Sequence, residues 1–220
     1  MKILVIAPHP DDETLGCGGS LLRHKYEGDE LYWCITTTIS EELGWSKEAV
    51  NNREMEIQSV EKKYSFSGVF NFKIPTTKVD TVPVSDLIRK ITNVYKEIEP
   101  NIIYLPFAHD VHTDHQLISK ASQSTLKWFR HPYIKKVLMY ETLSETENNY
   151  MQVNGFKPNL FVDISQYLDE KIEAMKIYES EMGDFPFPRS EKNIKALATL
   201  RGSQGGFAAA EAFELVFQRK

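Results

Sequence analysis

The sequence predicts an α/β protein with a Rossmann-like, doubly wound and mostly parallel sheet of order 3-2-1-4-5, followed by a C-terminal α/β extension. Two observations lead to this prediction. Short apolar runs alternate with longer segments of helical periodicity, which is the pattern of βαβ units. His/Asp clusters follow two of these runs, the first and the fourth in the chain, whose strands would be neighbours in a sheet of this order. A chain of 220 residues can bury such a core without disulfides.

The expected elements follow from this alternation. Five strands are expected in the first part of the chain, at Lys2–Ala7, Glu30–Thr38, Val69–Phe72, Asn101–Pro106 and Ile134–Tyr140. Four helices are expected between them, at Glu13–Tyr26, Ser46–Lys63, Val84–Ile98 and Asp114–Phe129. The C-terminal part then reads as a strand at Leu160–Ile164, a long amphipathic helix at Tyr167–Met182, a helix around Glu191–Thr199, a Gly-rich loop, and a last segment at Ala210–Phe217.

No repeat, low-complexity tract or linker divides the chain. The clusters of Gly, Pro and Asn at Asn148–Lys157 and Gly183–Ser190 indicate loops within one unit. We therefore expect a single domain over residues 1–220, with a core at 1–142 and an extension at 143–220 that packs on the same core.

The composition argues against several classes of partner. With 31 acidic and 26 basic side chains the net charge is -5, which gives no basic surface for nucleic acid or an anionic membrane. Cys17 and Cys34 have no CxxC spacing, so both are interpreted as reduced packing residues. The chain shows no targeting segment and no apolar run of bilayer length, so a cytoplasmic location is expected.

The first His/Asp cluster is Pro8–Glu13, with the sequence PHPDDE, directly after the first strand. Carboxylates here can cap a helix N-terminus, and this explains part of the segment. Capping does not explain His9 or two adjacent Asp residues, since a tight turn can send His9 and Asp12 to one centre while Asp11 reaches past it. The glycines of Gly16–Gly19 lie too far from the strand for a dinucleotide loop and are interpreted as helix–sheet packing positions.

The second cluster follows the fourth strand and reads DVHTDH from Asp110 to His115. A carboxylate beside a ligand or catalytic His fixes its tautomer, and Asp114 is placed to do this for His112 or His115. Catalytic zinc sites use three protein ligands and leave one position open. Of the side chains in the two clusters, His9, Asp12 and His115 would form such a set, with Asp11 as proton acceptor and His112 as acid or oxyanion partner.

PHPDDE followed downstream by DxHxDH resembles the LmbE-like, or PIG-L, family of zinc-dependent N-acetyl sugar deacetylases. That family includes the glucosamine-conjugate deacetylases of mycothiol and bacillithiol synthesis. The resemblance implies three zinc ligands, one general base, and a residue that stabilises the oxyanion or protonates the amine, together with its partner. By match to the motifs, the ligands are His9, Asp12 and His115, the base is Asp11, and the last pair is His112 with Asp114.

Arg53 in the segment REME resembles the RxxE element of that family, whose Arg contacts substrate. Arg53 shares a helical stripe with apolar residues, which indicates an inward position; the alternative is a surface pair with Glu56. The resemblance extends to C-terminal segments of the family at Phe161–Ser165, Arg201-Gly202 and Ala210–Phe213. It departs from the family after the RxxE helix and in the loop Ile39–Lys47, where Trp45 could stack on a sugar.

These features together predict a metal-dependent amidohydrolase that removes acetyl from an N-acetylglucosamine-type conjugate and releases a free amine. One Zn2+ per chain is the default cofactor, although a His/His/Asp site could take Fe2+, Co2+ or Ni2+. A two-metal phosphoesterase and a non-catalytic ligand-binding protein on the same fold are the alternatives. The partner expected is a small amino-sugar conjugate, without nucleic acid or membrane, and a homo-oligomer is possible.

Overall fold

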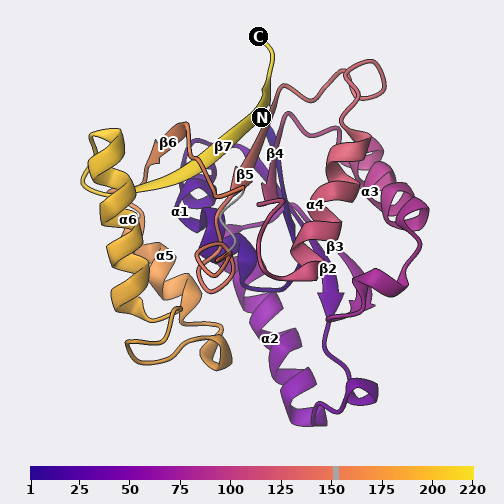
Figure 1. Cartoon of the computed structure of the whole chain (residues 1–220), viewed down its shortest axis with the longest axis horizontal. Helices are drawn as coiled ribbons and strands as arrows, with labels where there is room; N and C mark the ends of the chain where they lie inside the picture. The colour runs from indigo at the N-terminus through magenta and orange to yellow at the C-terminus, as the bar shows by residue number, and fades with distance from the viewer. Residues whose placement is uncertain (151–153) are drawn as a thin grey trace.

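The computed structural model describes residues 1–150 and 154–220, and its centre is one sheet of seven strands in the order β3-β2-β1-β4-β5-β7-β6 (Figure 1). The first five strands have the order 3-2-1-4-5, as the sequence predicted. The strands are β1 (Lys2–Ala7), β2 (Glu30–Thr38), β3 (Gly68–Pro75), β4 (Ile102–Pro106), β5 (Lys136–Tyr140), β6 (Leu160–Asp163) and β7 (Ala210–Gln218).

Strands β1 to β5 pair in parallel, and the C-terminal strands continue the same sheet in the opposite sense. Strand β7 runs antiparallel to both β5 and β6. Its register places Tyr140 opposite Phe213, both fully buried, so the extension shares its core with the parallel part. The segment at Ala210–Phe217, whose type the sequence did not reveal, is therefore this inserted strand.

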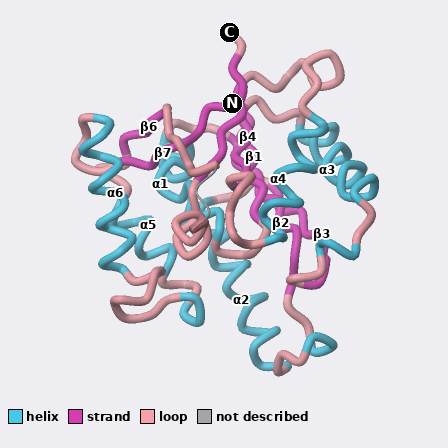
Figure 2. Tube along the Cα trace, viewed as in Figure 1, coloured by secondary structure: helices cyan, strands magenta, loops and turns pink. Residues whose placement is uncertain are grey.

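Helices lie on both sides of the sheet (Figure 2). Alternate side chains of each buried strand point to opposite faces, so each face has an apolar layer for helices to cover. Ile3 and Val5 of β1 pack in one apolar layer, whereas Leu4 and Ile6 pack in the other. Figure 1 shows α3 and α4 on one side and α5 and α6 on the other. The helices are α1 (Asp12–Tyr26), α2 (Lys47–Tyr64), α3 (Val84–Ile98), α4 (Thr113–Thr125), α5 (Leu168–Met175) and α6 (Glu191–Gly205).

Three expected helices end elsewhere. The helix expected at Tyr167–Met182 stops at Met175, because Tyr178 turns inward and its hydroxyl donates to Glu13 at 2.9 Å; a short 3-10 turn, η3 (Glu179–Glu181), follows. The helix expected to reach Phe129 ends at Thr125, where the Thr125 hydroxyl bonds to the carbonyl of Ser122.

The helix expected at Glu191–Thr199 continues to Gly205, so its last turns occupy the predicted Gly-rich loop. Gly202 allows the close approach there, since a Cβ at this position would lie 2.7 Å from the carbonyl oxygen of Phe207.

Helix α1 is broken at Cys17, whose φ of -145° and ψ of 20° are not helical. The buried carboxylate of Glu211 on β7 accepts the N–H groups of Gly19 and Ser20 at 2.8 and 2.7 Å, and so caps the second half of the helix. Lys171 pairs with Glu211 at 2.7 Å. This break lets the first half of α1 keep its own direction at the end of β1.

The glycines of α1 are packing positions, as the sequence indicated. A Cβ on Gly16 would lie 2.1 Å from the ring of Tyr140, and one on Gly19 would lie 2.7 Å from Ile164. The loop expected at Gly183–Ser190 is present, while part of that expected at Asn148–Lys157, residues 151–153, lies outside the described residues. None of the helices in the described ranges has the length and apolar character needed to cross a bilayer.

Candidate metal centre and active site

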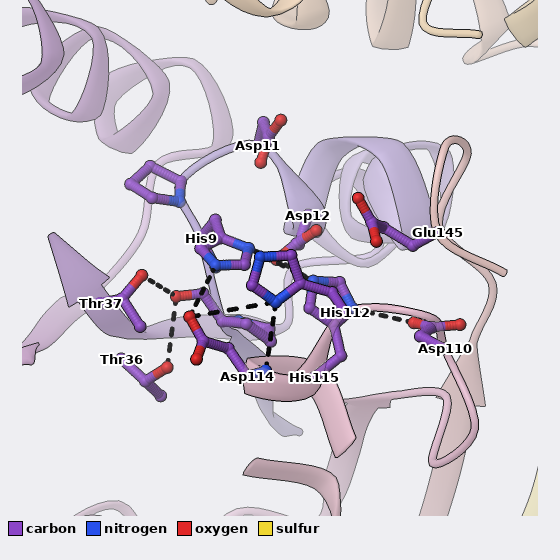
Figure 3. A network of polar contacts seen from close by, with 12 residues as sticks. His9, Asp11, Asp12, Thr36, Thr37, Asp110, His112, Asp114, His115 and Glu145 are labelled. Atoms are coloured by element: carbon purple, nitrogen blue, oxygen red, sulfur yellow. Dashed lines mark hydrogen bonds and ion pairs between the residues drawn. The ribbon is translucent and has the colours of Figure 1, made fainter. Parts of the chain in front are cut away.

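The two His/Asp clusters meet at one edge of the sheet, because they follow the carboxyl ends of the neighbouring strands β1 and β4. These strands pair in parallel, with Val5 opposite Tyr104. His9 and Asp12 come from the β1 side, and His115 comes from the first turn of α4 on the β4 side (Figure 3). The fold therefore brings together residues more than a hundred positions apart, as expected where neighbouring strands of a doubly wound sheet end.

Three ligand atoms from these residues form a nearly equilateral triangle. Asp12 Oδ2 lies 3.4 Å from His9 Nδ1 and 3.3 Å from His115 Nε2, and the two imidazole nitrogens are 3.3 Å apart. Zinc bonds of about 2.0–2.1 Å in a tetrahedral site place their ligand atoms about 3.3–3.4 Å from one another. The donor set therefore fits a tetrahedral metal ion, with the fourth direction left for a non-protein ligand.

The imidazole of His115 is oriented by Asp110, a residue to which the sequence gave no role of its own. His115 Nδ1 lies 2.8 Å from Asp110 Oδ2, and both side chains are fully buried. A carboxylate only accepts hydrogen bonds, so the proton is on Nδ1 and the Nε2 lone pair faces the triangle. The hydroxyl of Thr146 donates to the other oxygen of Asp110 at 2.6 Å.

The carboxylate of Asp114 supports His9, a histidine that the sequence did not pair with it, whereas its backbone N–H bonds to His112, one of the two that the sequence suggested. Its Oδ2 accepts from His9 Nε2 at 3.2 Å, which leaves His9 Nδ1 free to face the triangle. The backbone N–H of Thr77 donates to the same carboxylate at 2.8 Å. The contact of Asp114 with His112 is made instead by its backbone N–H, and its carboxylate lies 4.0 Å from His112 Nδ1.

His112 is held as a neutral donor. As the N-cap of α4, its Nδ1 accepts the N–H of Asp114 at 3.1 Å, so the proton of the neutral ring is on Nε2. Burial, followed by the charges of His9 and His115, lowers the pKa of His112 to about 4. A neutral imidazole with Nε2–H directed away from the helix can donate a hydrogen bond to an oxygen in the cavity. His109, by contrast, is exposed and packs on Phe107.

Asp11 lies beside the three residues of the triangle but is not part of it (Figure 3). Its backbone has a φ of 145°, a strained conformation for a residue with a side chain, and Glu13 Oε2 accepts its N–H at 3.1 Å. Glu13 is fully buried and also accepts the hydroxyl of Thr14 at 2.6 Å. Burial and the charge of Asp12 raise the pKa of Asp11 well above its ordinary value.

The side chains around the triangle favour a bound cation. Burial alone would lower the pKa of His9, but its hydrogen bonds with Asp114 and Asp12 raise that pKa to about 9. For the carboxyl group of Asp12 burial acts in the opposite direction and would raise the pKa, yet the charges and hydrogen bonds of His115 and His9 hold that pKa below its ordinary value. The carboxylates that stabilise protons on these rings would also stabilise a metal ion in their place.

A cavity of about 230 Å³ opens over the triangle, and Trp45, 47% exposed, lies in its wall. Its lining includes residues of the turn after β1, the end of β2, helix α2, the loop after β5 and the loop before α6. The lining residues that the sequence had not singled out include Thr37, Thr142, Ser144, Glu145, Glu181 and Arg189.

Comparison with known families identifies the family to which this chain is related. Residues 4–126, more than half of the chain, match the model of the family described as PIG-L, GlcNAc-PI de-N-acetylase. The chain belongs to the PIG-L family. The matched range contains both His/Asp clusters and Arg53, whereas Glu145, Glu181 and Arg189 lie beyond it.

One curated relative and two solved structures are similar to this chain, and the two structures show the same fold. Diacetylchitobiose deacetylase from Thermococcus kodakarensis is 24% identical over 230 residues, covering 98% of this chain and 83% of that protein. The structure of N,N'-diacetylchitobiose deacetylase from Pyrococcus horikoshii aligns with a TM-score of 0.76 and 21% identity, covering 98% and 83% of the two chains. GalB, the 4-carboxy-2-hydroxymuconate hydratase from Pseudomonas putida KT2440, aligns with a TM-score of 0.77 and 17% identity, covering 100% and 97%.

Arg53 of this PIG-L chain points inward, as its place in the apolar stripe predicted, and is 9% exposed. The alternative pair with Glu56 is also present, with Nε 3.1 Å from Oε2. The signal for Glu145 and Arg189 was absent from the sequence, because each lies in a loop without periodicity or a recognisable motif. Only the folded chain brings them to the cavity.

Proposed function

We propose that this protein hydrolyses the acetamide of an N-acetylated amino sugar, of the N-acetylglucosamine-conjugate type, to acetate and a free amine. The observation that carries the proposal is the triangle of ligand atoms 3.3–3.4 Å apart, with Asp11 and His112 beside it on one cavity. Membership of the PIG-L family and the likeness to diacetylchitobiose deacetylase support the choice of reaction and of sugar.

His9, Asp12 and His115 would hold the metal ion, which we propose to be one Zn2+ per chain. When bound, such an ion polarises a carbonyl and lowers the pKa of water to near 7. The same donor set would accept Fe2+, Co2+ or Ni2+, since imidazole and carboxylate ligands suit all four. The fit of the three donor atoms supports a metal site; the identity of the metal is our proposal.

Asp11 is placed to take a proton from the attacking water. It is 6% exposed and its carboxylate is not part of the ligand triangle, so it is free to act as a base. His112 is placed to donate its Nε2 proton to the oxygen of the acetyl group as negative charge develops there. Asp114 fixes the rings of both histidines, by its carboxylate for His9 and by its backbone N–H for His112.

The substrate is expected to be a small molecule that enters the cavity from its open side. The proposal includes no nucleic-acid or membrane partner; a homo-oligomer and a cytoplasmic location stay predictions of the sequence. Cys17 and Cys34 are buried free thiols, which is compatible with that location.

Zinc-loaded protein should release acetate from N-acetylglucosamine conjugates and expose one new amine per acetate. Asp11→Asn should retain one metal per chain and lower kcat by roughly two to four orders of magnitude, as for loss of a general base. Asp80→Asn, an exposed site on the turn η2 (Val79–Thr81), is the matched control and should have wild-type kinetics.

Each alternative function predicts a different outcome. Two metals per chain and cleavage of phosphate esters would instead support a phosphoesterase. Metal and sugar binding without acetate release from any conjugate would support a non-catalytic binding protein. Hydration of an unsaturated acid without amide cleavage would place the chain with the hydratase that shares its fold.

A further inference from the structure

Asp11 occupies the N-cap position of α1, but its side chain does not cap the helix. An Asp at this position ordinarily has an extended backbone, and its carboxylate accepts N–H groups of the first turn. Here the φ of 145° and ψ of -27° depart from that geometry, and the side chain makes no capping bond. The backbone carbonyl of Asp11 accepts the N–H groups of Thr14 and Leu15, at 3.0 and 2.8 Å. The carboxylate is therefore free to line the cavity.

The peptide between Pro10 and Asp11 is held on both sides. Its oxygen accepts from Nη1 of Arg53 at 2.7 Å, and its N–H donates to Oε2 of Glu13 at 3.1 Å. A Glu that reaches back to the N–H of the N-cap residue resembles one half of a capping box, in which the N-cap side chain caps the helix in return. The returning half is missing in this chain. Glu13 thus satisfies the N–H of Asp11 without engaging the Asp11 carboxylate.

Glu13 is itself fixed from two other parts of the fold. Its Oε1 accepts the hydroxyl of Thr14 at 2.6 Å and that of Tyr178 at 2.9 Å. Tyr64, at the end of α2, donates to Thr14 at 3.1 Å, so the proton of Thr14 is available for Glu13. Tyr178 follows α5 and lies beyond the range matched by the family model. All four side chains are fully buried.

A buried carboxylate of this kind is costly for the fold unless hydrogen bonds compensate it. Glu13 has no cationic partner within residues 1–150 and 154–220, and its hydrogen bonds come from neutral donors. Neither Glu13 nor Tyr178 belongs to the described lining of the cavity, so both lie away from the place of a substrate. Of the residues that donate to Glu13, Asp11 is the one with a strained backbone, and such strain persists only when the surroundings impose it.

We infer that Glu13 is a positioning residue. Together with Tyr178 of the C-terminal extension, it holds the backbone of Asp11 in a conformation that keeps the Asp11 carboxylate in the cavity and off the N-terminus of α1. This inference rests on the proposed function, in which Asp11 takes a proton from the attacking water. Without the carboxylate of Glu13, Asp11 would return to the ordinary N-cap geometry and its carboxylate would accept from the first turn of α1.

The first test is a double-mutant cycle that follows acetate release from an N-acetylglucosamine conjugate. Glu13→Gln keeps the shape of the side chain but places an amide against donors that need an acceptor. The kcat should therefore fall about 10- to 100-fold, as for a base displaced by about 1 Å, with KM within about threefold of wild type and the metal content unchanged. In the Asp11→Asn background the same change should lower kcat by less than about threefold, because Glu13 acts through Asp11.

Tyr178→Phe is the milder variant, since it keeps the bond between Glu13 and Asp11. It removes one donor to Glu13, so kcat should fall about two- to tenfold with KM unchanged. Glu173→Gln and Tyr26→Phe, both at exposed positions, are the matched controls and should have wild-type kinetics. An equal loss of kcat with and without the Asp11 carboxylate would overturn the inference. An unchanged kcat or a loss of metal in Glu13→Gln would overturn it as well.

Backbone strain gives a second readout that needs no turnover. Gly adopts a φ of 145° without strain and Ala does not, so Asp11→Gly should have a thermal midpoint about 2–8 °C above that of Asp11→Ala. When Glu13→Gln is added to both variants, this gap should shrink to less than about half, because the backbone at position 11 is released. The difference between Gly and Ala in the unfolded chain is the same in both backgrounds and cancels. An equal gap in both backgrounds would show that packing alone imposes the conformation, and the inference would be abandoned.

The two tests separate this inference from the proposed function. If the wild type releases no acetate from any conjugate, the proposed function fails, and the thermal midpoints decide whether Glu13 holds the backbone of Asp11. If acetate is released but the two substitutions act additively on kcat, the proposed function stands and the inference fails.

Discussion

Replacing Asp110 by Asn is expected to lower the zinc affinity of the site about tenfold. Asp110 contacts no metal ligand atom in the triangle; it acts on His115 Nδ1 at 2.8 Å, in a position without solvent access. An Asn can still accept that proton, but as a neutral group it loses the charge-assisted part of the bond. The hydroxyl of Thr146, which donates to Asp110 at 2.6 Å, must then also find a new orientation.

The magnitude follows from the difference between the two kinds of hydrogen bond. A bond to a charged group contributes about 1.5–3 kcal/mol and a neutral one about 0.5–1.5 kcal/mol, so the change costs about 1–1.5 kcal/mol. This corresponds to about a five- to thirteenfold weaker Kd. Asp110→Ala removes the acceptor altogether and should approach a hundredfold loss, the upper end for partners of metal-binding histidines.

Competition between the protein and a chromophoric zinc chelator at fixed pH measures these affinities directly. Asp80→Asn again serves as the matched control, since its carboxylate is exposed. A Kd for Asp110→Asn within twofold of wild type would show that His115 is oriented by the surrounding packing alone, and the assignment of Asp110 would be abandoned. A loss of metal from Asp80→Asn would point to a general effect of charge.

Two further predictions concern the break in α1. Glu211→Ala should destabilise the fold by about 3–5 kcal/mol, because it leaves Lys171 charged and buried without its partner. The midpoint temperature of thermal unfolding should fall by roughly 6–20 °C. Glu173→Gln, which removes a carboxylate from an exposed ion pair, is the control and should leave the midpoint unchanged. Gly16→Ala should lower the free energy of unfolding by about 1–3 kcal/mol, because the new methyl group would lie 2.1 Å from the ring of Tyr140. An unchanged midpoint of urea unfolding would contradict this packing argument.

The sequence alone was enough to predict the parallel part of the sheet, and it predicted that His9, Asp12 and His115 share one centre, which the structure shows as a triangle of candidate ligand atoms. Alternating apolar runs and helical segments indicate the strands β1 to β5, and a doubly wound sheet places the ends of β1 and β4 together. His9 and His115 could therefore be assigned to one centre without coordinates. The inward position of Arg53 followed from the same kind of argument, since a helical stripe reports which side of a helix is buried.

The tertiary structure decided which groups act on those ligands. Asp110 and Asp114 are both carboxylates in the same short cluster, and their positions in the sequence do not reveal that one supports His115 and the other His9. That choice depends on the turn at the start of α4 and on backbone N–H groups after β3, which are far away along the chain. Periodicity carries no information about such turns.

The C-terminal part shows the same limit on a larger scale. The sequence of β7 is an apolar segment that could be a strand or a helix, and only pairing with β5 and β6 makes it the strand that carries Glu211. The loop with Arg189 reaches the cavity because that strand and α6 bring it there. Local sequence thus determined the strands β1 to β5 and brought His9, Asp12 and His115 forward as candidate ligands, whereas long-range packing determined their supporting hydrogen bonds and the cavity wall.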